Sequence, residues 1–111
     1  MILDTVSLLS ETITMNIKTT LVFTEWLINL KDKQGRGIIL KHIDRMKLGN
    51  LGKIKKIHES IFEKKIYFGP GYRLYFVHEN DNLIILLCGG DKSTQQKDIE
   101  KAKSLKEELQ L

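Results

Sequence analysis

The sequence predicts a single α+β domain, and three observations support that prediction. The chain has 111 residues, a length that suits one domain. Apolar residues recur at helical spacing in its first half and again near its end, whereas short β-branched or aromatic segments separated by turn residues fill the middle. The expected order is β-α-α-β-β-β-β-α, with an antiparallel sheet packed against an N-terminal helix hairpin and a C-terminal helix.

The first half predicts a short strand over 13–18 and two helices, over about 20–32 and about 35–48. Phe23, Trp26, Leu27 and Leu30 follow the i, i+3, i+4, i+7 spacing of one apolar helix face. Ile39, Ile43 and Met46 repeat this spacing in the second helix. Gly49 and Asn50 end the second helix, because both residue types tolerate the left-handed conformation of a helix end. The short connection between the helices predicts an antiparallel hairpin.

The second half predicts four strands and a final helix. The strands are expected over 53–58, 61–68, 72–78 and 83–88. Residues 83–88 are apolar on both pleat faces, which is typical of a central, covered strand. Ser93 and Gln96 have the spacing of a capping box, and they predict the start of the helix. Ile99, Ala102, Leu105 and Leu109 then mark the apolar side of that helix.

The middle hairpin predicts a surface that mixes cations with aromatic rings. If Gly69–Gly71 is the loop, Phe68 pairs with Tyr72 and Lys65 with Tyr75. Alternation then places Phe62, Ile66, Phe68, Leu74 and Phe76 on the core face. The opposite face, expected to be open to solvent, carries Glu63, Lys65, Tyr67, Arg73 and Tyr75. Such a face suits phosphates and unstacked bases.

The net charge of +4 points to an acidic partner, and it is concentrated around this hairpin. The cations of this stretch are Lys53, Lys55, Lys56, Lys64, Lys65 and Arg73, against Glu59 and Glu63. We expect Lys53, Lys55, Lys56, Tyr67 and Tyr75 to bind RNA. An ordinary solvated sheet face with cross-strand charge pairs remains the alternative.

Several other classes of function are disfavoured. The lone Cys88 excludes a disulfide within the chain, and the three histidines lack metal-ligand spacing, so no metal or cofactor is expected. His58 adjoins the basic stretch, where it is a candidate acid or base near neutral pH. The longest apolar run is far shorter than the roughly 20 residues of a membrane span. The N-terminus does not read as a signal peptide, so the expected location is the cytoplasm.

Several short motifs occur in an order and spacing that together carry a resemblance. They are Phe23-x-x-Trp26-Leu27, Gly49-Asn50-x-Gly52, Gly69-Pro70-Gly71-Tyr72-Arg73-x-Tyr75-Phe76 and Leu86-Leu87-x-Gly89-Gly90-Asp91-Lys92-Ser93-x-Gln95-x-x-Asp98-Ile99. The chain resembles addiction-module toxins of the RelE/ParE superfamily, above all the HigB-like "addiction module killer protein" group. The resemblance implies a RelE-like toxin domain over 15–111. Residues 1–14 would be an extension that is poorly ordered or outside the core.

The resemblance implies the toxin of a type II toxin–antitoxin module. RelE-like members cleave mRNA in the ribosome without a metal, whereas ParE-like members of the same fold inhibit DNA gyrase. The implied partners are mRNA, the ribosome and a helix-turn-helix antitoxin of HigA type, which binds the toxin in a hetero-oligomer.

The same resemblance implies the catalytic residues. Arg73 occupies the position of an arginine that contacts the scissile phosphate, and Lys92 matches a second basic position after the last strand. Lys65 stands where the group has arginine, and it is a candidate base, with Glu63 as the other. The lysine pair of RelE proper falls on Ile61 and Glu63, and its base-stacking tyrosine falls near Asp98. Because Arg73 is predicted to lie off the core face, charge reversal there is expected to leave the fold intact.

Overall fold

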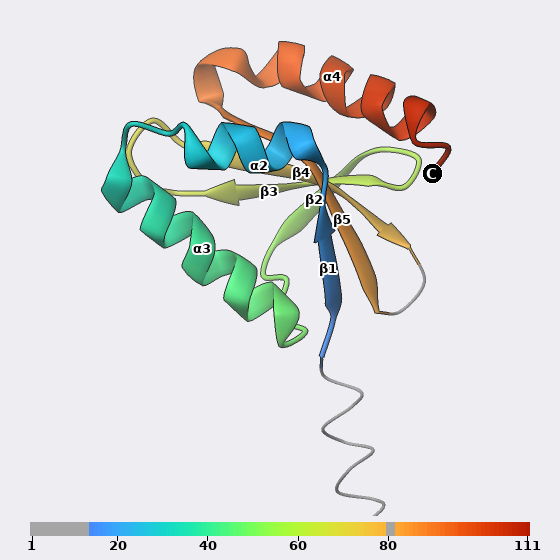
Figure 1. Cartoon of the computed structure of the whole chain (residues 1–111), viewed down its shortest axis with the longest axis horizontal. Coiled ribbons are helices and arrows are strands. Elements are labelled where there is room, and N and C mark those ends of the chain that lie inside the picture. Colours follow the sequence, from blue (N-terminus) through green and yellow to red (C-terminus); the bar gives the residue numbers. More distant parts are fainter. Residues whose placement is uncertain (1–13, 80–81) are drawn as a thin grey trace, which may run out of the picture.

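The computed structural model describes residues 14–79 and 82–111, and the predicted order of elements is confirmed (Figure 1). The elements are β1 (Asn16–Thr19), α2 (Leu21–Ile28), α3 (Lys33–Lys47), β2 (Ile54–His58), β3 (Ile61–Ile66), β4 (Tyr72–Glu79), β5 (Leu83–Asp91), a 3-10 turn (Lys92–Thr94) and α4 (Gln95–Glu108). Apart from Thr14, the predicted N-terminal extension lies outside the described residues. None of the helices in the described part is both long and apolar enough to span a bilayer.

The five strands form one mixed sheet in the order β1-β5-β4-β3-β2, so the prediction of a wholly antiparallel sheet is wrong at one edge. β1 pairs with β5 in parallel, from Asn16 opposite Leu83 to Thr19 opposite Leu86, while the other neighbours are antiparallel. A parallel pair needs a long crossover, which two helices and three strands supply here. That pairing joins distant segments, and local periodicity carries no information about it.

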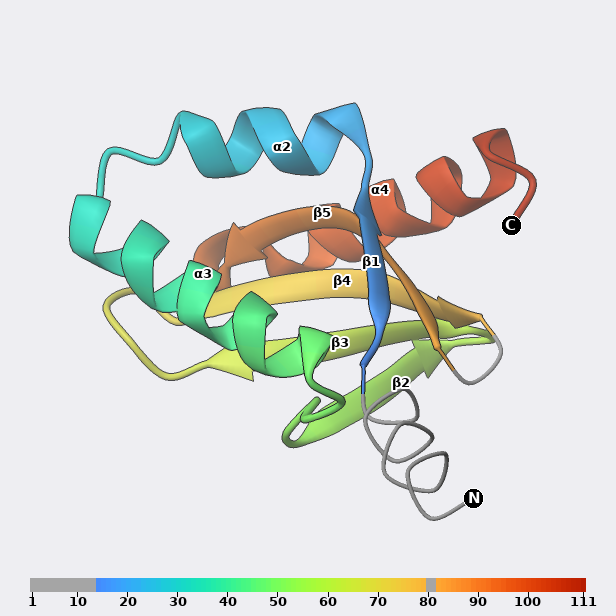
Figure 2. The same cartoon turned by 60° about the horizontal axis from the view of Figure 1, so that its bottom comes forward.

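Helices cover both faces of the sheet, with α2 and α3 on one side and α4 on the other (Figure 2). The first core lies beneath α2 and α3 and contains Phe23, Ile39, Ile43, Met46, Ile66, Tyr72, Leu74, Phe76, Ile84 and Leu86, with Phe62 and Phe68 packed against it. This confirms the predicted core face of the hairpin.

The opposite face of the sheet is also core, which corrects the expectation of an open platform. Its buried members are Ile61, Tyr75, Val77, Leu87, Cys88 and Ala102. α4 packs on this face through Ala102, with Ile99 and Leu105 beside it. The reason is visible in β5, because a strand that is apolar on both faces needs cover on both.

The register of the hairpin differs from the predicted register by two residues. Ile66 lies opposite Tyr72 and Lys65 opposite Arg73, so the connection spans residues 67–71. The Phe68 N–H donates to the Ile66 carbonyl, and the Gly71 N–H donates to the Phe68 carbonyl. These contacts close a wider loop than the three-residue loop expected. A shift of two residues leaves every side chain on its predicted face.

The turn before α4 is capped by Asp91, and the predicted capping box at Ser93 is wrong. The Asp91 carboxylate accepts the Ser93 N–H at 2.8 Å, and Thr94 completes a capping box with it. Lys92 therefore sits in a 3-10 turn directly after β5. This turn places Lys92 beside the β3–β4 loop, where a Cβ added at Gly71 would lie 3.8 Å from Lys92 Cβ.

Candidate functional site

The three predicted catalytic cations line one hollow of about 290 Å³. Lys65 and Arg73 are cross-strand partners on β3 and β4, and Gly90, two residues before Lys92, lies opposite Arg73 on β5. Tyr67 completes the wall, together with Ile66, Gly71 and Tyr72. We call this hollow the cationic pocket. Its existence depends on the pairing of β4 with β5, which brings Lys92 beside the β3–β4 hairpin that carries Lys65 and Arg73.

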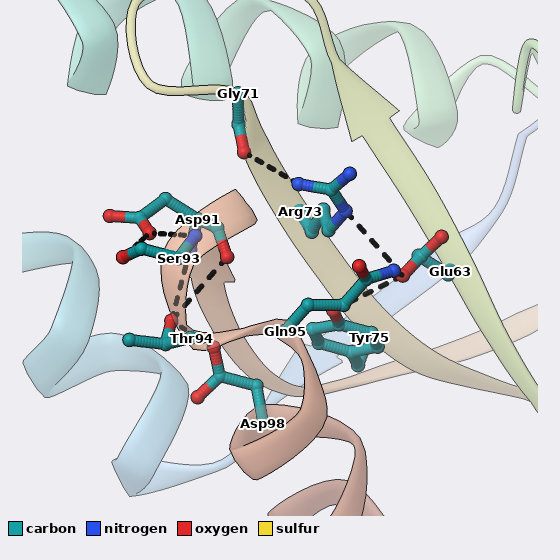
Figure 3. Close-up of polar contacts among 9 residues, drawn as sticks. All are labelled: Glu63, Gly71, Arg73, Tyr75, Asp91, Ser93, Thr94, Gln95 and Asp98. Carbon is teal, nitrogen blue, oxygen red and sulfur yellow. Dashed lines mark hydrogen bonds and ion pairs between the residues drawn. The ribbon is translucent and has the colours of Figure 1, made fainter.

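Arg73 lies at the base of the cationic pocket and is largely shielded from solvent, with 6% of its surface exposed. Its Nη1 donates to the Gly71 carbonyl at 3.1 Å, and its Nε lies 3.7 Å from Glu63 Oε2 (Figure 3). Lys65, Tyr67 and Lys92 are exposed around it. The predicted open platform is therefore a rim of exposed side chains around an inward, ion-paired guanidinium.

Glu63 is the centre of a buried polar network behind Arg73. Its Oε2 accepts hydrogen bonds from the Tyr75 hydroxyl at 3.1 Å and from Gln95 Nε2 at 2.9 Å (Figure 3). Neither Glu63 Oε1 nor Arg73 Nε has a hydrogen-bond partner among the described residues. Glu63 does not line the cationic pocket, and its contacts help to hold Arg73 in place, so its role as acid or base stays a prediction.

Tyr75 is unavailable for base stacking, contrary to the prediction. The residue is fully buried beneath α4, and its hydroxyl is committed to Glu63. Burial raises the pKa of Tyr75, and the neighbouring Glu63 carboxylate raises it further. The exposed ring of the site is Tyr67, with 88% of its surface accessible.

Tyr72, in the wall of the pocket, is hydrogen-bonded to Asp32, the residue that precedes α3. The Tyr72 hydroxyl donates to Asp32 Oδ2 at 2.7 Å, while Asp32 Oδ1 accepts the Gly35 N–H and caps α3. The Gly35 N–H and the Tyr72 hydroxyl hold the pKa of Asp32 below its usual value. Burial and the Asp32 contact raise the pKa of Tyr72 to about 12.

A second hollow of about 410 Å³ adjoins the pocket and contains two of the predicted RNA-binding lysines. Its lining residues are His42, Gly52, Lys53, Ile54, Lys55, Glu63, Lys64, Lys65 and Tyr67. We call it the basic groove. Lys65 and Tyr67 line both hollows. Sequence reasoning missed His42 and counted Lys64 only as charge, since neither burial nor the approach of α3 to β3 is visible in a local pattern.

His58 and Lys56 lie apart from the cationic pocket. His58 ends β2, comes within 3.9 Å of Glu59 and lines a hollow with the C-terminal residues of α4. Lys56 is exposed opposite Phe62 and lines neither the pocket nor the groove. The structure thus places His58 outside the cationic pocket, and its role as acid or base stays a prediction that this arrangement does not support.

The cationic pocket is suited to a phosphate group. A guanidinium presents its donors in a planar fork that matches two oxygens, and two flexible ammonium groups stand at the rim. Cations fixed in a shielded site stabilise negative charge that develops in a transition state. Among residues 14–79 and 82–111, no group of three or more His, Cys, Asp or Glu side chains is arranged to hold a metal ion.

Comparison with known proteins finds a relative of this chain. No protein-family model matches the sequence. The chain is 51% identical over 98 residues to an uncharacterized protein from Haemophilus influenzae, and the alignment covers 88% of this chain and 99% of the relative. Two chains that share this identity over nearly their whole length share a common fold. The chain therefore belongs to the same family as this Haemophilus influenzae protein.

Proposed function

We propose that the chain is the toxin of a type II toxin–antitoxin module, in the HigB-like group of the RelE/ParE superfamily. It inhibits translation by cleaving mRNA on the ribosome without a metal ion. The observation that carries this proposal is the convergence of Lys65, Arg73 and Lys92 on one hollow. The resemblance implies Arg73 and Lys92 as catalytic from their places in the motifs, and Lys65 as a candidate base from its position on the preceding strand, where the group has arginine.

The cleavage proceeds by attack of a ribose 2′-hydroxyl on the adjacent phosphate. The new bond to phosphorus closes a 2′,3′-cyclic phosphate, and the bond to the 5′-oxygen of the next nucleotide breaks. Arg73 stabilises the extra negative charge on the phosphorane. Lys65 accepts the proton of the 2′-hydroxyl when its amine is neutral, and Lys92, as an ammonium group, delivers a proton to the departing 5′-oxygen.

The partners follow from the same proposal. A helix-turn-helix antitoxin of HigA type binds the toxin, forms a hetero-oligomer with it and blocks its action. The positive surface of the pocket and groove supplies attraction to the mRNA backbone. An adjacent open reading frame that encodes such a DNA-binding protein, and that restores growth when coexpressed, supports the module.

The test uses the two exposed cations, because they can be removed without opening the buried network. Lys65→Ala and Lys92→Ala are each expected to lower the rate of mRNA cleavage by about 10²-fold. Lys18→Ala is the matched control, since Lys18 is exposed on the edge strand β1 and lines neither the pocket nor the groove. Cuts are mapped by primer extension after induction. Growth arrest with intact transcripts would reject cleavage.

Inhibition of DNA gyrase is the second candidate, and a specific observation favours it. Arg73 is tied to Gly71 and Glu63, and Tyr75 is buried, so the pocket has fewer free reactive groups than an mRNA-cleaving site of RelE type. Loss of supercoiling by purified gyrase in the presence of the chain, with transcripts intact, would support this candidate. Unchanged supercoiling would exclude it.

A further inference from the structure

The basic groove is built by the backbone at the edge of the sheet. β2 begins at Ile54, opposite Lys64, whereas the pairing of β3 with β4 continues to Ile66. The last two residues of β3 therefore run past the start of β2. The chain turns away at Gly52, where φ is +67° and an added Cβ would lie 2.8 Å from Lys64 Nζ. The resulting notch is open beside Lys65.

The groove concentrates positive charge. Lys53, Lys55 and Lys65 are exposed, while Lys64 is buried and donates from Nζ to the Leu51 carbonyl at 2.8 Å. Burial and the nearby Arg45 lower the pKa of Lys64. Burial, Lys64 and Arg45 likewise lower the pKa of His42. Burial is the larger cause of both shifts, and repulsion from the neighbouring cations Lys64 and Arg45 adds to it.

One carboxylate, Glu63, is among the described lining residues of the groove, and it is largely committed elsewhere. Its Oε2 already accepts from Tyr75 and Gln95, and Arg73 is its ionic neighbour. It therefore neutralises little of the charge presented by Lys53 and Lys55. The groove remains attractive to a phosphate.

Tyr67 stands on the ridge between the groove and the cationic pocket. It lines both hollows, and 88% of its surface is exposed. An exposed ring between two cationic hollows suits a strand with unpaired bases, because each base offers a flat face for stacking and each phosphate a negative charge. A paired duplex buries its bases and leaves the ring without a partner.

We propose that the basic groove is a second nucleotide subsite, which holds the part of a single-stranded RNA that adjoins the nucleotide in the cationic pocket. Lys53 and Lys55 contact its phosphate, and Tyr67 stacks the base that crosses the ridge. The inference rests on the proposed function in taking RNA as the ligand. It adds a binding site distinct from the cleavage site, and this site determines which flanking nucleotides are held.

Binding and cleavage are measured separately, so that the two proposals fail separately. The full chain, labelled with nitrogen-15, is titrated with a short single-stranded RNA whose 2′-hydroxyls are methylated to prevent cleavage. The amides of residues 52–55 and 65–67 are expected to shift. Tyr67→Ala is expected to weaken binding by about tenfold. Tyr67→Phe retains the ring and should bind as the wild type does.

The charge test uses a double variant with a matched control. Lys53→Ala/Lys55→Ala is expected to weaken binding and to reduce the slope of log affinity against log salt by about 0.7 for each phosphate that the variant no longer neutralises. Lys18→Ala/Lys101→Ala removes the same charge from exposed positions on β1 and α4, and it should leave the slope nearly unchanged.

Each outcome supports or overturns the subsite. Wild-type affinity in the Lys53→Ala/Lys55→Ala variant, in a chain that cleaves mRNA in cells, overturns the subsite and leaves the proposed function intact. Binding with the expected shifts in a chain that cuts no transcript supports the subsite and rejects cleavage. The subsite is also overturned if the wild type binds no RNA, or if the double variant loses only antitoxin binding.

Discussion

Arg73 Nε lies 3.7 Å from Glu63 Oε2, and only 8% and 1% of the two side chains are exposed. This pair joins the base of the cationic pocket to the network beneath α4. The Glu63 carboxylate therefore helps to position the Arg73 guanidinium, although Glu63 itself does not line the cationic pocket.

Glu63→Gln is expected to lower the free energy of unfolding by about 3 kcal/mol, because it leaves Arg73 shielded without its counter-charge. Chemical denaturation measures the change. Glu59→Gln is the matched control: its side chain is 67% exposed and reaches Lys106 at 3.5 Å on the surface. That variant should stay within about 0.5 kcal/mol of the wild type. Equal losses in the two variants would contradict the role given to Glu63.

Charge reversal at Arg73 is expected to destabilise the fold, contrary to the expectation from sequence. Arg73→Glu would set a second carboxylate against the buried Glu63, where no described cation replaces the lost one. Lys65→Glu, at the exposed cross-strand neighbour, should remain as stable as the wild type. Thermal unfolding followed by circular dichroism compares them. A fully stable Arg73→Glu would show that the pair is not structural.

Alkaline pH is expected to destabilise the protein through two tyrosines. The pKa of Tyr72 is raised to about 12 and that of Tyr75 is raised as well, so both keep their protons in the fold when the unfolded chain has lost them. The unfolded state binds fewer protons above pH about 10, so stability is present below that pH and falls as pH rises through the folded pKa values.

Denaturant titrations across this pH range measure the slope. Tyr75→Phe removes one of the two ionising groups, and it should flatten the pH dependence while lowering stability at neutral pH by about 1–2 kcal/mol. Tyr67→Phe alters only an exposed hydroxyl, and it should leave neutral stability unchanged. A wild-type stability that stays constant through the alkaline range, up to the folded pKa of Tyr72 at about 12, would contradict the prediction.

Gly89→Ala is expected to destabilise the contact between β5 and α2. An added Cβ would collide with the Trp26 ring, so either the ring or the strand must move. Gly37→Ala makes the same change within α3 where nothing lies within 4 Å, and it should stabilise the protein by about 0.5–1 kcal/mol. Melting temperatures that shift in the same direction would refute the packing argument.

The type of each secondary-structure element and its buried side were largely predictable from the sequence, because both depend on residues close together in the chain. The spacing of Phe23, Ile39 and Ile43 predicted helices whose buried sides are confirmed, and alternation in β3 and β4 put Lys65 and Arg73 on one face. The prediction went wrong in the loop, where residues 67–71 replaced a three-residue turn, and at the cap of the last helix. Both errors concern hydrogen bonds that several local arrangements satisfy equally well.

In the candidate site, too, some features depend on neighbouring residues and others on contacts with a distant helix. Alternation was enough to put Lys65 and Arg73 on one face of the hairpin, since pleat geometry is a local property, whereas Lys92 was added to the site only by the resemblance. Whether each would be exposed was settled by α4, which returns from the end of the chain to cover Tyr75 and Glu63. The ion pair and the notch beside Lys64 lie within neighbouring strands, but the burial of Glu63 and Arg73 arises from contacts with α4, a distant segment, and no local pattern records the free energy of such contacts.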